Sequence, residues 1–132
     1  MRTRRAACSC EQLSLVAEGE PVRISMCHCL ACQRRTGSAF GVQARFEEER
    51  VRIEGRSNDY ARISDEGEER VFSFCPECGA TVFYRAVSAP GLIAVPVGAF
   101  ADPGFPAPRV SVWESRRHPW VEVPETIEEH LH

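Results

Sequence analysis

The chain has 132 residues, 43% of them apolar, and a formal net charge of −3 at pH 7. This length and composition predict a single globular domain over residues 1–132 and argue against a disordered chain. The small negative charge argues against nucleic acid as a partner, because such binding needs a basic face. The sequence contains no long apolar run, so we expect no membrane partner. The basic start Met1–Arg5 lacks the apolar segment of a secretory signal, so we expect a reducing, cytoplasmic compartment.

The first predicted elements in chain order are two strands and a short helix. Leu13–Ala17 and Val22–Met26 have strand patterns, and the turn residues Gly19–Pro21 between them favour a hairpin. Leu30–Thr36 has helical character and is followed by Gly37, a residue typical of a helix C-terminus. The predicted hairpin therefore links the first cysteine cluster of the chain to the second.

The rest of the chain has mainly strand patterns. Further strands are predicted at Ala39–Phe46, Val51–Ile53, Tyr60–Ile63, Arg70–Phe74, Thr81–Val87, Leu92–Val97 and Val110–Trp113. The polar segment 64–69 and the turn Ala89–Gly91 predict two more hairpins. Glu125–Leu131 is predicted to form a last helical turn. Together these elements predict a small, mainly all-β domain with short helical turns.

Seven cysteines lie in three tight clusters. They are Cys8 and Cys10; Cys27, Cys29 and Cys32; and Cys75 and Cys78. Gaps of one or two residues suit a metal ion better than a disulfide, and an odd number disfavours a disulfide-rich secreted module. Four thiolates complete a tetrahedral zinc site and leave three. Three protein ligands beside a vacancy are typical of a zinc ion that takes part in chemistry.

The segment Cys75-Pro76-Glu77-Cys78-Gly79 is the strongest local indication of metal binding. Its backbone N–H groups can point at the first sulfur, and Gly79 permits the backbone angles that follow the second ligand. Spacing leaves open whether the second pair is Cys8 and Cys10 or two of the middle three. Pairing the outer clusters is favoured, because it ties the start of the chain to its middle. We therefore predict a structural zinc on these four cysteines, with a merely buried cysteine pair as the alternative.

The middle cluster is predicted to be the functional site. An extended C-x-C would point its side chains in opposite directions, so the chain must bend from strand into helix, whose N-terminus favours thiolates. We predict a second, open and labile zinc on Cys27, Cys29 and Cys32, which are also the candidate catalytic residues. His28 is expected to point away from it. The alternatives are a second structural zinc or a thiol cluster without metal.

Two arginines follow this cluster directly. Arg34 and Arg35, with Ser38 nearby, are the candidate substrate-binding residues. Two guanidinium groups beside an open metal suit a substrate that carries carboxylates. A solvated helix face is the alternative for either arginine.

The order of these motifs resembles a known family. The motifs are C-x-C at Cys8, C-H-C-x-x-C at Cys27, R-R-T-G-S at Arg34, C-P-x-C-G at Cys75, V-G-A-F-A-D-P at Val97 and W-E-S-R…W from Trp113 to Trp120. Over nearly its whole length the chain is similar to the glutathione-dependent formaldehyde-activating enzyme (GFA) family, also called the centromere protein V/GFA family. The resemblance implies a zinc-stapled β-tent of several small coiled antiparallel sheets. It also implies a structural zinc on the outer four cysteines and a second zinc on the middle three, displaced or shared when glutathione binds.

The chain departs from the family pattern at two positions. Glu11 stands where members usually carry glycine, and this change bears on the turn after the first C-x-C. Ser111 stands where members often carry histidine two residues before the Trp113 position, which argues against a role for a late histidine. Neither departure affects a cysteine.

The leading functional hypothesis is a zinc-dependent enzyme that joins glutathione, or an analogous thiol, to an aldehyde. This activity would resemble that of an S-hydroxymethylglutathione synthase. Formally it is a carbon–sulfur lyase that runs in the direction of bond formation. The alternative is a non-catalytic carrier or interaction module that binds zinc and glutathione. A third hypothesis is a thiol redox enzyme similar to certain methionine sulfoxide reductases. This hypothesis predicts a disulfide between Cys32 and either Cys27 or Cys29. The sequence leaves the oligomeric state open.

Overall fold

The structure, a computed structural model, describes residues 1–132 and consists mainly of β-strands. The strands are β1 (Thr3–Ala7), β2 (Ser14–Glu18), β3 (Arg23–Cys27), β4 (Gly41–Glu47), β5 (Val51–Glu54), β6 (Asn58–Ile63), β7 (Glu69–Phe74), β8 (Thr81–Ala86), β9 (Leu92–Pro96), β10 (Val110–Val112) and β11 (Glu129–His130). One α-helix, α1 (Leu30–Thr36), and three short 3-10 helices, η1 (Glu48–Arg50), η2 (Val97–Phe100) and η3 (Glu114–Arg116), complete the fold. The prediction of a mainly β domain is confirmed.

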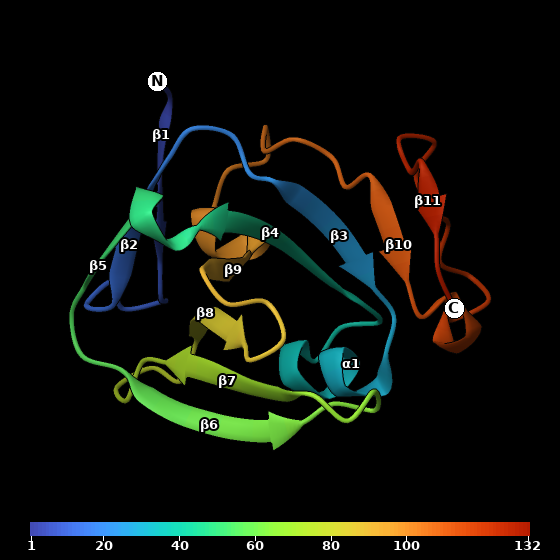
Figure 1. Ribbon diagram of the computed structural model, residues 1–132, viewed down its shortest axis with the longest axis horizontal. Coiled ribbons are helices and arrows are strands. Elements are labelled where there is room, and N and C mark those ends of the chain that lie inside the picture. The colour runs from blue at the N-terminus through green and yellow to red at the C-terminus, as the bar shows by residue number, and fades with distance from the viewer.

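The strands form two sheets. The smaller has the order β1-β2-β5, and the larger has the order β11-β10-β3-β4-β9-β8-β7-β6. The larger sheet is curved, so that β3 and β4 lie across from β7 and β6, with α1 near the open end between them (Figure 1). Its pairs are antiparallel except at β10, which runs parallel to both β3 and β11. Side chains of the central strands thus face one another across the concave side.

The main core lies between the two sheets. Leu15 of the small sheet packs in one buried cluster with Phe46 and Ile93 of the large sheet, and each is at most 1% exposed. Burying a side chain of this size contributes about 1.5–3 kcal/mol. Cys8 and Cys75 belong to the same cluster. The core therefore positions the loops that carry the outer cysteines.

Several local predictions are confirmed. The helix spans Leu30–Thr36 as expected, and Gly37 follows it in the left-handed conformation at φ 70°. The hairpins β6–β7 and β8–β9 form in the predicted places.

The structure contains no helix with the length and apolarity needed to cross a lipid bilayer.

Two local predictions are wrong. β2 and β3 do not pair as a hairpin, because β2 lies between β1 and β5 whereas β3 lies between β4 and β10. The segment Glu125–Leu131 forms no helical turn and instead contains β11. Its backbone extends the edge of β10, where the Leu131 N–H donates to the carbonyl of Ser111 at 2.8 Å. In both cases the pairing between strands decided the outcome, because β1 and β5 occupy the two edges of β2, and the segment that contains β11 pairs with β10.

Candidate metal centres and the cavity beside them

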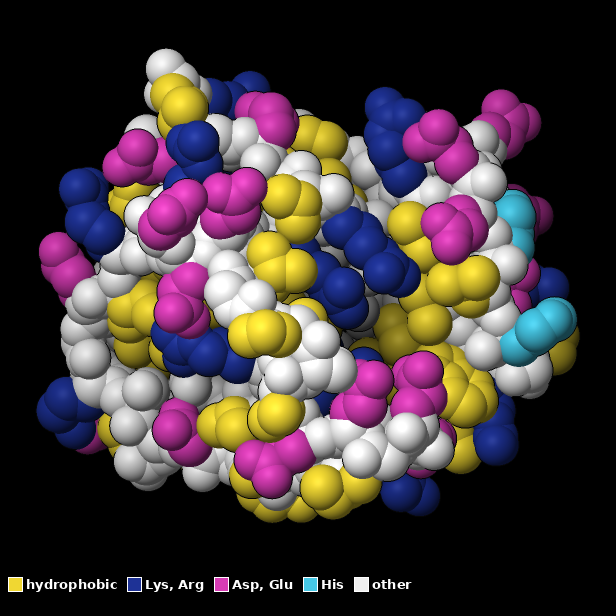
Figure 2. Space-filling model, in the orientation of Figure 1, with side chains coloured by type: hydrophobic (Ala, Val, Ile, Leu, Met, Phe, Trp, Pro, Cys, Tyr) yellow, Lys and Arg dark blue, Asp and Glu magenta, His cyan; other side chains and the backbone are white.

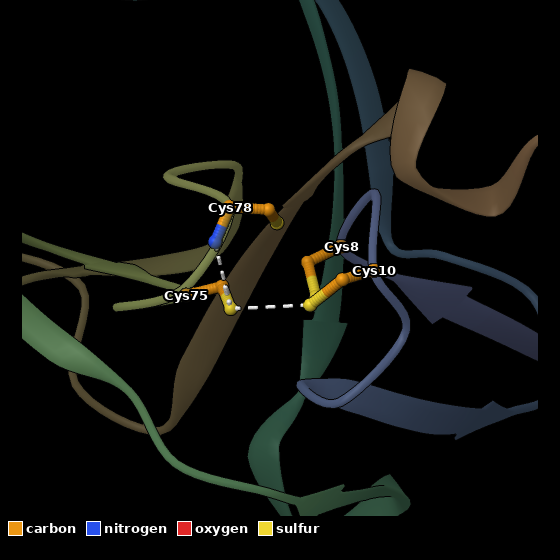
Figure 3. A group of neighbouring side chains, drawn as sticks. All are labelled: Cys8, Cys10, Cys75 and Cys78. Carbon is orange, nitrogen blue, oxygen red and sulfur yellow. Dashed lines mark hydrogen bonds between the residues drawn. The ribbon is translucent and has the colours of Figure 1, made fainter.

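The outer four cysteines come together at one point. Cys8 and Cys10 lie on the loop after β1, and they face Cys75 and Cys78 on the turn between β7 and β8 (Figure 3). All four sulfurs lie within 4.8 Å of one another. The Cys8–Cys10 and Cys10–Cys75 sulfur distances are 3.6 and 3.7 Å. Sulfurs at 2.3 Å from a tetrahedral zinc would be about 3.8 Å apart, so this group fits the ion.

Hydrogen bonds prepare Cys75 to act as a thiolate. The N–H groups of Glu77 and Cys78 point at Cys75 Sγ at 3.3 and 3.5 Å, and Gln12 Nε2 donates to it at 3.0 Å. Burial raises the pKa of Cys75, but the bonds from Cys78, Gln12 and Glu77 outweigh it and lower the pKa to about 6. The turn thus has the predicted N–H geometry, and Gly79 has the expected positive φ of 82°. These donors favour metal binding, because zinc binds the thiolate form.

The middle three cysteines also converge. Cys27 ends β3, Cys29 caps the start of α1, and Cys32 lies in its first turn. Their sulfurs lie within 4.8 Å of one another, and the Cys32 N–H donates to Cys29 Sγ at 3.3 Å. Hydrogen bonds from the thiols of Cys27 and Cys32 lower the pKa of Cys29. The strand-to-helix bend therefore creates a second group that can hold a metal ion.

His28 lies beside these cysteines but faces another way. It is fully buried, with Nε2 3.1 Å from the hydroxyl oxygen of Ser111, and its Nδ1 has no partner. Burial lowers the pKa of His28, which favours the neutral ring. Ser111 thus takes a place in the interior, against the ring of His28.

A cavity of about 370 Å³ opens beside the middle cysteines. Cys27 and Cys32 line one part of it, and Trp113 and Val112 pack against the cysteine group. Its walls come from β3, β4, β6, β7, β8 and β10, which places it on the concave side of the large sheet. The lining also includes four arginines: Arg23, Arg45, Arg62 and Arg70. A substrate in this cavity would meet both sulfur and positive charge.

Of the predicted substrate-binding residues, two lie outside this cavity and Arg35 lies at its edge, and their role in substrate binding stays a prediction. Arg34 and Ser38 are exposed and line a separate depression with His118 and Trp120. Arg35 stacks over the rings of Phe72 and Tyr84, at 5.5 and 5.7 Å, without lining the cavity itself. The rotation of helix α1 turns Arg34 and Ser38 away from the concave face, whereas Arg35 lies against two side chains that line it.

Sequence reasoning missed the arginines that do line the cavity. One signal was present, because Arg23, Ser25 and Cys27 alternate along one strand and must share a face. No such signal was present for Arg45, whose position depends on strand register.

Comparison with known proteins adds a family and a fold. Residues 3–116 match the sequence profile of the family described as glutathione-dependent formaldehyde-activating enzyme. Among solved structures, the crystal structure of a Rhodobacter sphaeroides protein, a structural-genomics target, is similar with a TM-score of 0.54. The two chains are 21% identical, and the match covers 72% of this chain and 85% of the other, which shows a shared fold. No curated protein gives a significant match.

Proposed function

The chain belongs to the glutathione-dependent formaldehyde-activating enzyme family, and from this premise we propose that it joins a glutathione-like thiol to an aldehyde. The observation that carries the proposal is the convergence of Cys27, Cys29 and Cys32 beside a cavity that Cys27 and Cys32 line. The reaction is an addition: a carbon–sulfur bond forms, and the thiol proton passes to the aldehyde oxygen. All seven cysteines are free of disulfide bonds, and the reducing compartment that we propose for this protein would keep them so.

The three sulfurs are a suitable donor set for zinc with one position open. When bound there, the ion would lower the pKa of an incoming thiol from its usual value of about 8.5 and act as a Lewis acid. The chain itself contributes orientation: the Cys32 N–H fixes Cys29 Sγ, and Trp113 covers one side of the group. The cavity supplies room for the thiol next to Cys27 and Cys32.

The decisive test compares adduct formation by the wild type and by Cys29→Ser. Free thiols add to formaldehyde unaided, so the rate must be measured at several protein concentrations against the uncatalysed rate. We expect a protein-dependent increase in the wild type and none in Cys29→Ser. Zinc content should fall from two ions per chain to one, and the circular dichroism spectrum should stay unchanged. Equal rates for both proteins would overturn the proposal.

A carrier without catalysis is the second candidate. It is favoured by the burial of the three cysteines, each of which is at most 6% exposed. Such a protein would bind glutathione, measured by calorimetry, and leave the rate of adduct formation at its uncatalysed value.

A further inference from the structure

Three cross-strand pairs lead along the cavity from the middle cysteines. On β3 and β4 the pairs are Cys27–Gly41, Ser25–Gln43 and Arg23–Arg45. Alternate residues of a strand share a face, and all of these residues except Gly41 line the cavity. The wall thus changes from sulfur, through neutral polar groups, to a pair of guanidinium groups. Four residues at about 3.3 Å each separate the two ends by roughly 13 Å along β3.

Arg23 and Arg45 are like charges placed directly opposite each other. Such pairs destabilise a sheet, and neither arginine takes part in any ion pair of the structure. Arg23 Nε is buried without a hydrogen-bond partner. Burial, and next the charge of Arg45, lower the pKa of Arg23, and the field of Glu129 only partly opposes this. The protein therefore keeps positive charge at this end of the cavity without a partner of its own.

The other arginines of the cavity have partners. Arg70 lies 4.0 and 3.6 Å from carboxylate oxygens of Glu66 and Glu68. Arg62 lies over the ring of Phe72 at 5.0 Å. In the space-filling view, basic side chains lie recessed at the centre of the hollowed face, over the region of β3 and β4 (Figure 2). Arg62 and Arg35, which lie toward the cysteine end, also have no ion pair, and Arg35 Nε is buried without a partner. What distinguishes the other end is that two guanidinium groups, those of Arg23 and Arg45, stand directly opposite each other there.

We propose that Arg23 and Arg45 bind a carboxylate of the thiol substrate while its sulfur lies at Cys27, Cys29 and Cys32. This inference rests on the proposed function and specifies its substrate class: an elongated anionic thiol, such as a short peptide with free carboxyl groups. A small neutral thiol reaches only the sulfur end. Gln43 lies between the ends, 5% exposed, and its Oε1 has no partner. That oxygen can accept a hydrogen bond from a peptide N–H of the substrate.

The test measures binding directly, by calorimetry on the zinc-loaded protein. S-methylglutathione is the first probe, because its blocked sulfur separates carboxylate binding from thiol chemistry. Its dimethyl ester lacks both negative charges, and 2-mercaptoethanol is the small neutral thiol. The variants are Arg23→Gln and Arg45→Gln. Arg52→Gln is the matched control, since Arg52 is exposed on β5 and lies outside the cavity.

We expect each cavity variant to bind S-methylglutathione at least about tenfold more weakly, the scale of one charge-assisted hydrogen bond. The dimethyl ester should bind the wild type more weakly by a similar factor and should not distinguish the wild type from the variants. Arg52→Gln should stay within about twofold of the wild type. Binding of 2-mercaptoethanol should not change in any variant.

Thermal unfolding gives an independent measurement. Without ligand, Arg45→Gln should unfold at a higher temperature than the wild type, because the repulsion with Arg23 is removed. S-methylglutathione should raise the midpoint of the wild type and of Arg52→Gln, and it should raise that of either cavity variant less. Wild-type affinity in both cavity variants, or equal affinity for the acid and its ester, would overturn the inference. If binding depends on the arginines but the wild type does not speed adduct formation, the proposed function fails and this inference stands.

Discussion

The side-chain amide of Gln12 donates a hydrogen bond of 3.0 Å to Cys75 Sγ, although the two residues are 63 positions apart. Gln12 Nε2 also donates to the carbonyl of Arg56 at 2.8 Å, and its Oε1 accepts from the Arg56 N–H at 3.0 Å. One side chain therefore links the first cysteine loop, the segment after β5 and the second cysteine turn. Groups in this position orient metal ligands and stabilise their charge.

Replacing Gln12 by Met should weaken zinc binding at the outer four cysteines. Met keeps the side-chain length but removes the donor to Cys75 and both bonds to Arg56. We expect zinc affinity to fall by about 10–100-fold, as is typical when a group that orients a metal ligand is lost. Competition with a chromogenic chelator measures the change.

Glu77→Gln is the control for this variant. It removes the exposed Arg56–Glu77 ion pair at 3.1 Å but keeps the Glu77 N–H that points at Cys75. Exposed pairs contribute about 0–1 kcal/mol, so zinc affinity should stay near the wild-type value. A Gln12→Met protein that holds zinc as tightly as Glu77→Gln would show that the Gln12–Cys75 contact is incidental.

Loss of the outer and the middle metal sites should have different consequences. Cys75 is fully buried in the main core, whereas Cys29 belongs to a separate small cluster. A closed four-thiolate zinc contributes on the order of 10 kcal/mol, comparable to the whole stability of a domain. Cys75→Ser should therefore abolish cooperative unfolding, and Cys29→Ser should keep it. Thermal unfolding followed by circular dichroism, with zinc content measured on the same samples, checks both outcomes.

The sequence predicted elements better than it predicted their partners. Helix α1 could be predicted because its cue is local: Gly37 directly follows the helical residues. β1 was missed because two of its five residues are arginines, yet Arg4 is only 7% exposed and pairs with Glu20 at 3.2 Å. That strand takes the edge of β2 which the hairpin prediction had given to β3. The β1–β2 pair is a local hairpin that the arginines of β1 concealed, whereas β3 pairs with β10 far along the chain, and nothing within either segment reveals that pairing.

In the candidate site, too, features with a local cue could be predicted from the sequence and features that depend on distant strands could not. The cysteine groups could be predicted because close spacing already brings ligands together within each loop. The cavity could not, since it requires β3, β4 and β7 to be placed across a curved sheet. The predicted role of Arg34 rested on its nearness in sequence to Cys32 and stays a prediction. The direction of a side chain on a helix depends on the rotation of the helix, and Arg34 lines a different depression. Arg45 lies at the cavity only because of its register with Arg23.

Replacing Glu11 by Gly should stabilise the first cysteine loop. Glu11 has φ 66°, a left-handed conformation that costs a non-glycine residue roughly 1–2 kcal/mol. Its exposed ion pair with Arg5 at 3.1 Å offsets about 0–1 kcal/mol of this. Glu11→Ala loses the same ion pair but keeps the strain, so it should be about 1 kcal/mol less stable than Glu11→Gly. Denaturant unfolding of the two variants measures this difference, and equal stabilities would mean that the turn is unstrained.

Replacing Gly55 by Ala should destabilise the protein far more than the same change at Gly67. Both residues have positive φ, 100° and 82°, so both variants incur backbone strain of roughly 1–2 kcal/mol. A Cβ at Gly55 would lie 2.0 Å from the carbonyl oxygen of Gln12, whereas one at Gly67 would meet nothing within 4 Å. The clash displaces the backbone that carries Gln12, so Gly55→Ala should lose about 3 kcal/mol or more, and zinc affinity with it. Chemical denaturation and chelator competition on both variants test this coupling. Similar losses in the two would show that the loop moves freely and that Gln12 does not depend on the close approach of Gly55.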